Sequence, residues 1–202
     1  MGSDEGKNPY WVREELRRRR LYVGGEKSTG IDHNKECFIL MGLLKECGKS
    51  KNLYKGTRIH EMIVDKGLLG KNSYLARSLI SMYAKCGALD EAREIFNEMS
   101  GCDVISWNTL IGGYAENGFI EDALAFMSQM RVQGMSPNDA TFSCILKGCI
   151  SVEDLEVGLN MHGEIIKAGF ETDSFVCNTL VNMYGKCRQL EEARAVFSEF
   201  PV

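Results

Sequence analysis

Three stretches of the sequence repeat one pattern: LISMYAKCG (residues 79–87), LIGGYAENG (residues 110–118) and LVNMYGKCR (residues 180–188). Each places two aliphatic residues three and four positions before a tyrosine, which is the spacing of one face of an α-helix. An alanine follows each tyrosine nine positions later. Because both the apolar face and the downstream alanine keep their register, the pattern predicts repeated helical units.

Two further repeats are identified by a second pair of matches. LLKEC at residues 43–47 matches ILKGC at residues 145–149, and His60 shares with His162 the same separation of 102 positions. Five repeats of three lengths are therefore predicted. In the order long, short, standard, long and short, they span residues 37–72, 73–103, 104–138, 139–173 and 174–202.

Each repeat is predicted to be a pair of helices. In the third repeat, one helical face holds Trp107, Leu110, Ile111 and Tyr114, and Asn117-Gly118 ends the helix. A second face follows, made of Ile120, Ala123, Leu124, Met127 and Met130. One small residue recurs in every repeat and indicates close approach of paired helices: Gly56, Ala92, Ala123, Gly158 and Ala193. A single helix pair cannot bury both of its faces, so the repeats must stack into an all-α solenoid.

Composition excludes several classes of protein. No apolar run approaches the roughly 18 residues of a membrane-spanning helix, so no membrane association is expected. The net charge of −4 gives no overall basic surface for nucleic acid, so any such binding must use a local stripe of lysine and arginine. The eight cysteines form no Cys-x-x-Cys motif and are expected to be reduced, buried and structural, with no metal or cofactor bound.

The chain resembles a plant pentatricopeptide repeat protein, of the subclass that alternates standard, long and short motifs. Three phrases carry the resemblance over residues 37–202: DVISWNTLIGGYAENG (residues 103–118), MYAKCGALDEAREIFNEM (82–99) and GLNMHGEIIKAGFETD (158–173). The resemblance implies a right-handed α-solenoid of stacked helix-turn-helix repeats. It also implies that single-stranded RNA binds in the concave groove, at one base per repeat.

In this family the fifth and last residues of a repeat read the base. For the standard repeat these are Asn108 and Asn138, a combination similar to readers of pyrimidines, cytosine more than uracil. An amide offers both a donor and an acceptor to the edge of a base. In the other repeats the pairs are less clear. Arg77 with Asp103 departs from the usual residues, Ser143 with Asp173 is similar to a guanine reader, and the closing partner of Asn178 would fall beyond the given sequence. Arg77 and Asp103 could instead form a salt bridge, and long repeats of this family read poorly.

The resemblance also implies residues that hold the RNA without reading it. The second residue of each repeat sandwiches a base, which gives Tyr74, Ile105, Ala140 and Phe175. Lys85 and Lys186 occupy the place of phosphate-contacting lysines, where the standard repeat has Glu116. A lysine at the end of a helix can equally serve only to complement the helix dipole.

No catalytic residues are predicted. His162-Gly163-Glu164 spells the first half of a zinc deaminase motif, but no Cys-x-x-Cys follows, and the same repeat position holds His60-Glu61-Met62. The chain is therefore predicted not to be an enzyme. Its expected partners are an organellar transcript and an editing deaminase, or another editing-complex protein, acting in trans. The alternative is a scaffold for protein–protein interaction that does not bind RNA.

Residues 1–36 differ from the repeats and are predicted to be a charged arm or cap. Glu14 and Glu15 precede Arg18 and Arg19 by four residues, a spacing that favours a short charged helix. Family membership implies a mitochondrion or chloroplast, although no import signal is recognisable in this sequence. The chain is expected to be a fragment of a longer protein.

Overall fold

The computed structural model describes residues 33–69, 72–99 and 101–198, and every regular element in these ranges except a single 3₁₀ residue at Leu69 is an α-helix. The predicted arm lies almost entirely outside them. The helices are α2 (His33–Lys49), α3 (Leu53–Asp65), α4 (Ser73–Lys85), α5 (Leu89–Glu98), α6 (Val104–Glu116), α7 (Ile120–Val132), α8 (Asp139–Val152), α9 (Leu155–Lys167), α10 (Ser174–Lys186) and α11 (Leu190–Ser198).

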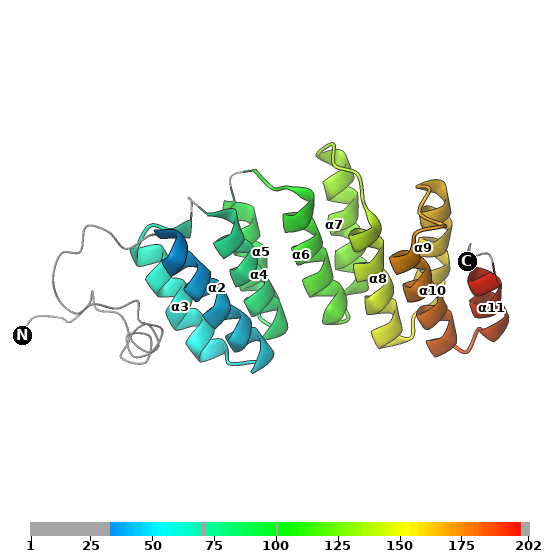
Figure 1. Ribbon diagram of the computed structural model, residues 1–202, viewed down its shortest axis with the longest axis horizontal. Coiled ribbons are helices and arrows are strands. Elements are labelled where there is room, and N and C mark those ends of the chain that lie inside the picture. The colour runs from blue at the N-terminus through cyan, green and yellow to red at the C-terminus, as the bar shows by residue number, and fades with distance from the viewer. Residues whose placement is uncertain (1–32, 70–71, 100, 199–202) are drawn as a thin grey trace, which may run out of the picture. The chain divides into compact units, whose positions relative to one another are not determined.

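The chain divides into two compact units at Ser100, and each unit is built of stacked helix pairs. In unit 1, α2 packs against α4, and each of these helices pairs with the helix that follows it. In unit 2, α6, α8 and α10 pack side by side, and α7, α9 and α11 pair with them in turn (Figure 1). The predicted α-solenoid of helix-turn-helix repeats is thus confirmed.

The last residue of one repeat caps the first helix of the next. Asn72, Asp103, Asn138 and Asp173 each accept hydrogen bonds from backbone N–H groups in the first turn of α4, α6, α8 and α10. These four helices begin at the first residues of the repeats that the sequence predicted. The exception is α2, which starts at His33, four residues before residue 37, because Asn34, Lys35 and Glu36 continue the helix.

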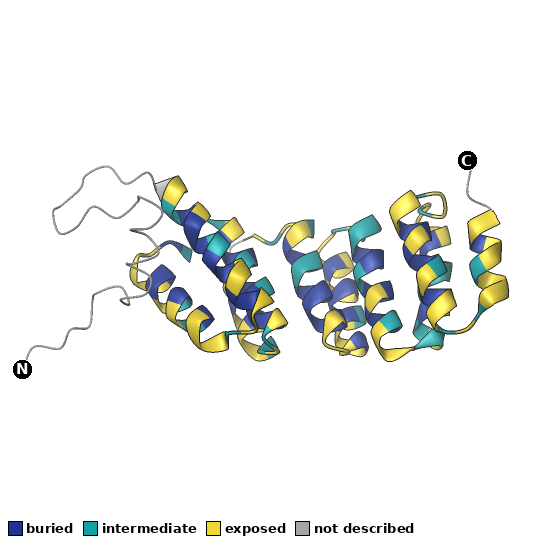
Figure 2. Cartoon of the chain, turned by 60° about the horizontal axis from the view of Figure 1, so that its bottom comes forward, coloured by how far each residue is buried: buried dark blue, intermediate teal, exposed yellow. Residues whose placement is uncertain are grey.

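The core lies between the helices of each unit, as the facing buried stripes in Figure 2 show. The predicted face of α6 is buried, including Trp107 and Tyr114. In α7 the prediction was wrong at one position, since Leu124 is half-buried and Phe126 is buried instead. Phe126 packs edge-to-face on Tyr114, with ring centroids 4.8 Å apart, and this contact across the helix pair selects it for the core.

The recurring glycines mark a closer contact than the one expected. A side chain at Gly56 of α3 would overlap the sulfur of Met82 in α4, and one at Gly158 of α9 would lie 2.6 Å from the sulfur of Met183 in α10. The close approach is therefore between the second helix of one repeat and the first helix of the next. Paired helices within a repeat do not account for it, because these methionines belong to the following repeat.

Candidate functional site

The predicted reading pair of the standard repeat is joined by hydrogen bonds. The Nδ2 of Asn108 donates to the Oδ1 of Asn138 at 2.9 Å. Thr141 completes the group, because its Oγ1 lies 2.6 Å from the Oδ1 of Asn108 and 3.0 Å from that of Asn138. All three are in unit 2. The structure thus brings together two residues that are thirty positions apart in the sequence.

Helix capping explains how these side chains meet. Asn138 precedes α8, and its Oδ1 accepts from the backbone N–H of Thr141 at 3.1 Å. Thr141 Oγ1 accepts in return from the backbone N–H of Asn138 at 3.1 Å, which completes a capping box. Because α6 packs along α8, Asn108 in the second turn of α6 reaches this cap. The Asn138 amide oxygen is therefore turned toward the helix start.

Exposed apolar side chains lie one turn before the reading positions. Ile105 is 60% exposed, while Ala140, its expected sandwich partner on α8, is half-buried. Tyr74 and Phe175 are exposed at the same place in α4 and α10. Phe38 of α2 occupies this position too and is 73% exposed, although it was missed as a candidate. Its signal was available, because it is the second residue of the first long repeat.

The Arg77 side chain is not exposed at the surface of unit 1. It is only 9% exposed, and its guanidinium carbon lies 4.6 Å above the centre of the Tyr74 ring. Asp103 belongs to unit 2, where its Oδ1 accepts from the backbone N–H of Ser106 at 2.8 Å and from the Ser106 hydroxyl at 2.7 Å. Each residue thus has a structural role within its own unit.

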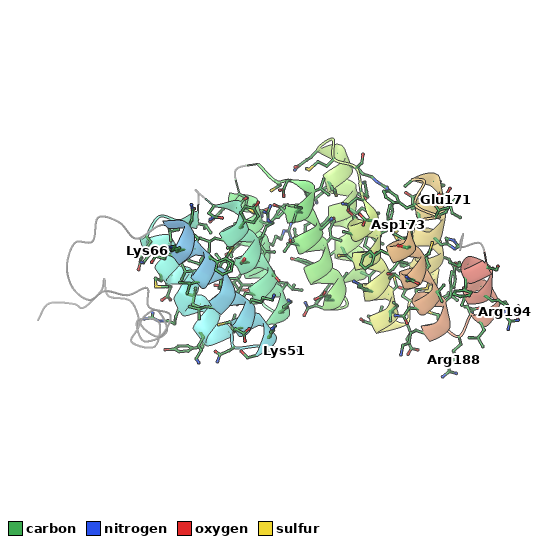
Figure 3. All side chains as sticks on the ribbon, in the orientation of Figure 1. Lys51, Lys66, Glu171, Asp173, Arg188 and Arg194 are labelled. Carbon is green, nitrogen blue, oxygen red and sulfur yellow. The ribbon has the colours of Figure 1, made fainter. Side chains whose placement is uncertain are left out.

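The second long repeat differs from the expected reader. Ser143 is 1% exposed, and its hydroxyl makes no hydrogen bond within the described residues. A base cannot reach a side chain buried in this way, so Ser143 is removed from the reading set. Asp173 caps α10 by accepting from the N–H groups of Phe175 and Val176, at the end of α10 opposite to Arg188 (Figure 3). Asn178 of α10 is exposed.

Basic residues gather at the ends of the first helices. Lys85 and Lys186 are exposed in the last turns of α4 and α10, whereas α6 ends in Glu116. Lys147 of α8 is also exposed, and its amine lies 5.0 Å from the centre of the Phe175 ring. Except for α3, the second helices begin instead with acidic residues, namely Asp90, Glu91, Glu121, Asp122, Glu156, Glu191 and Glu192. The negative net charge is therefore not evenly spread.

Sequence comparison gives the family. A model described as the PPR repeat family matches residues 102–151, and one described as the PPR repeat matches residues 77–104 and 175–201. The chain belongs to the pentatricopeptide repeat family. Together the two models match about half of it, in both units.

Curated relatives from Arabidopsis thaliana match most of this PPR chain. Pentatricopeptide repeat-containing protein At3g22690 is 37% identical over 174 residues, which are 86% of the chain and 20% of the relative. At4g25270, named chloroplastic, is 38% identical over 81% of the chain and 31% of its own length. At3g09040, named mitochondrial, is 36% identical over 87% of the chain and 17% of its own length. The chain spans less than a third of the length of these relatives.

A solved structure has the same arrangement of helices. The pentatricopeptide repeat protein PPR10, crystallised in complex with an 18-nt psaJ RNA element, matches with a TM-score of 0.69 at 26% identity. The match covers 91% of this chain and 26% of PPR10. The residues that the structure describes therefore have the PPR fold.

The residues of the zinc-deaminase-like motif make contacts between helices of the PPR repeats. His162 Nδ1 lies 2.7 Å from the Tyr184 hydroxyl. Glu164 accepts hydrogen bonds from Arg131 and Lys167, and these bonds lower the pKa of its carboxyl group. Within the described residues, no group of three histidine, cysteine or acidic side chains could hold a metal ion. Packing between repeats thus explains this His-x-Glu.

The thiols are also part of the packing. All eight cysteines are free, and four of them are buried. Burial raises the pKa of Cys149 to about 12 and raises the pKa of Cys47 as well, so both remain protonated near neutral pH. In the part of the chain that the structure covers, no helix is long and apolar enough to cross a membrane.

Proposed function

We propose that this chain binds single-stranded RNA along its first helices and selects a pyrimidine at Asn108 and Asn138. The observation that carries the proposal is the hydrogen-bonded amide pair beside the exposed Ile105. An amide pair supplies donors and an acceptor to the edge of a base, and an apolar side chain one turn away supports its face. Peptide binding would instead favour aromatic or methionine anchors at the amide positions.

The placement of charge supports the same surface. Three first helices, α2, α4 and α10, end in Lys49, Lys85 and Lys186, whereas α6 and α8 have no basic residue in the last turn. Acidic residues start every second helix except α3. Lysines on the first helices can contact phosphates even though the net charge of the chain is −4. Few repeats have a complete set of reading residues, so binding by this chain is expected to be weak and strongly salt-dependent.

Relatives support a wider role. PPR10 was crystallised with an RNA element, and some relatives are named mitochondrial or chloroplastic. We infer that this protein acts in one of these organelles as an RNA editing or processing factor. Its repeats would select the site, and an editing deaminase or another protein would act in trans.

Fluorescence anisotropy with labelled C12, U12 and A12 RNA tests the proposal. Wild type is expected to bind the pyrimidine oligomers more tightly than A12, with affinity falling steeply between about 50 and 200 mM salt. Asn108→Ala should weaken binding of C12 by about five- to twentyfold, since it removes hydrogen bonds to the base.

Asn160→Ala is the matched control, because Asn160 is an exposed asparagine on α9 in the same unit. It should bind RNA like wild type. If wild type binds none of the RNA oligomers, or if neither base identity nor salt changes its affinity, this proposal is wrong and the protein–protein interaction scaffold is favoured.

A further inference from the structure

The hydrogen bonds around Thr141 fix the orientation of the Asn108 and Asn138 amide groups. The Oδ1 of Asn138 already accepts from the Nδ2 of Asn108 and from the backbone N–H of Thr141, which occupy its two lone pairs. The single proton of the Thr141 hydroxyl therefore goes to the Oδ1 of Asn108, at the shorter distance of 2.6 Å. This bond holds the Asn108 oxygen toward Thr141 and its nitrogen toward Asn138.

The network determines what remains for a base. Two N–H groups of Asn138, one N–H of Asn108 and one lone pair of the Asn108 oxygen make no hydrogen bond among the described residues. The pair thus presents mainly donors. On the Watson–Crick edge of cytosine the two acceptors, N3 and O2, are neighbours, whereas in uracil the N3–H donor lies between the acceptors O2 and O4. Two donors side by side, one from each amide, therefore match cytosine and would meet the N3–H of uracil.

From this network we propose that Thr141 is a positioning residue that sets the preference of the Asn108–Asn138 pair for cytosine over uracil. This proposal rests on the proposed RNA binding. It acts through the two amides and need not touch the RNA itself. The specificity of the standard repeat then depends on the third residue of the repeat that follows it.

The equivalent residues of other repeats show that positioning the amides is distinct from capping the helix. Val176 is the third residue of its repeat, yet Asp173 still caps α10 through backbone N–H groups alone. A hydroxyl at this position is therefore not required to begin the helix. In α6 the equivalent Ser106 donates to its own cap, Asp103, at 2.7 Å. Thr141 differs because its hydroxyl reaches, beyond its own cap, the Asn108 side chain on the first helix of the preceding repeat.

Thr141→Val tests the inference, since valine has nearly the same shape and already occupies this position in α10. In anisotropy titrations with C12 and U12 RNA, the ratio of the two affinities should fall about two- to tenfold from its wild-type value. Thr141→Ser keeps the hydroxyl and should restore the ratio. Thr179→Val is the matched control, because among the described residues the Thr179 hydroxyl bonds only to the Phe175 carbonyl oxygen of its own helix.

A second measurement needs no RNA. In the free protein, NMR should show slowed hydrogen exchange at the Nδ2 group of Asn108 in wild type and in Thr141→Ser, and faster exchange in Thr141→Val. Equal exchange in all three proteins overturns the inference, as does an unchanged C12 to U12 ratio in Thr141→Val. If wild type binds no RNA at all, the proposed function is overturned, and this inference with it.

Discussion

The first long and short repeats, residues 37–103, and the second long and short repeats, residues 139–202, share two kinds of interior contact but differ at their fifth residues. In one pair His60 Nδ1 lies 2.9 Å from the Tyr83 hydroxyl, and in the other His162 Nδ1 lies 2.7 Å from the Tyr184 hydroxyl. Both ring pairs are edge-to-face, with centroids 5.6 Å apart. A glycine meets a methionine of the next helix in both.

The reading positions of these two repeat pairs have diverged. The fifth residues are Met41 and Arg77 in the first pair, and Ser143 and Asn178 in the second. Packing between helices restricts the buried residues, because a change of even one methylene is felt in a close-packed interior. Asn178 is exposed and free of this restriction, whereas Arg77 and Ser143 are buried. The two repeat pairs therefore keep one fold although their fifth residues differ in both chemistry and exposure.

The largest effect is expected from shortening the leucine that both pairs bury. Leu79→Ala and Leu180→Ala should each lower the free energy of unfolding by about 2–5 kcal/mol, because both side chains are fully buried. Urea denaturation measures the loss, and hydrogen exchange locates it. We expect lost protection within residues 33–99 for the first variant and within residues 101–198 for the second. A cost below about 1 kcal/mol in either would show that the interiors are not equivalent.

A smaller loss is expected when the tyrosine hydroxyls are removed. Tyr83→Phe and Tyr184→Phe each remove the hydroxyl that meets a histidine nitrogen. The Tyr83 hydroxyl has a second hydrogen bond, to the Thr57 side chain. Each change should lower the free energy of unfolding by about 1–2 kcal/mol, with the larger loss for Tyr83→Phe. Urea denaturation measures both, and a larger loss for Tyr184→Phe would contradict this order.

The turn after α4 and the turn after α10 hold different residues at the same position, and these residues can be exchanged. Gly87 has φ of +79°, and the equivalent Arg188 has φ of +60°, a region that favours glycine. Gly87→Arg should therefore destabilise the protein by about 1 kcal/mol. Arg188→Gly should stabilise it by about 0.5 kcal/mol, since the added freedom of glycine in the unfolded chain offsets part of the gain. Thermal unfolding checks both signs, and two changes of the same sign would contradict the argument.

The smallest effect is a dependence of stability on pH in unit 1. Burial lowers the pKa of His60 below its ordinary value of 6.5, although Glu98 and Glu61 act in the opposite direction. The unfolded chain therefore takes up a proton before the folded protein does, and stability present above pH 6.5 is lost as the pH falls through the folded pKa. His60→Gln should reduce the decrease in Tm between pH 7.5 and 5. Identical pH profiles would remove His60 as the cause.

Much of the fold could be predicted because its signals are local. The spacing of Leu110, Ile111 and Tyr114 specified a helical face, and Gly118, with φ of +85°, ends the helix that the sequence predicted to stop there. The buried face of α7 could not be predicted at every position, because both Leu124 and Phe126 are compatible with a helix. Only contact with Tyr114 distinguishes them, and that contact depends on how the helices pack.

The candidate site was predictable in position but not in detail. Repeat register located Asn108 and Asn138, and it could equally have located Phe38. Register could not show that Ser143 is buried or that Arg77 lies over the Tyr74 ring. Burial depends on neighbouring helices, whose distance is not encoded in the spacing of residues along one helix.

By itself, therefore, the sequence determined the helical repeats and their register, since periodicity and helix caps act over a few residues. The family resemblance then implied which positions of each repeat read a base. Tertiary structure alone decided that Thr141 joins the Asn108 and Asn138 amides in one network. Its hydroxyl lies 33 positions from Asn108 along the chain, and only the packing of α6 along α8 brings them within hydrogen-bonding distance.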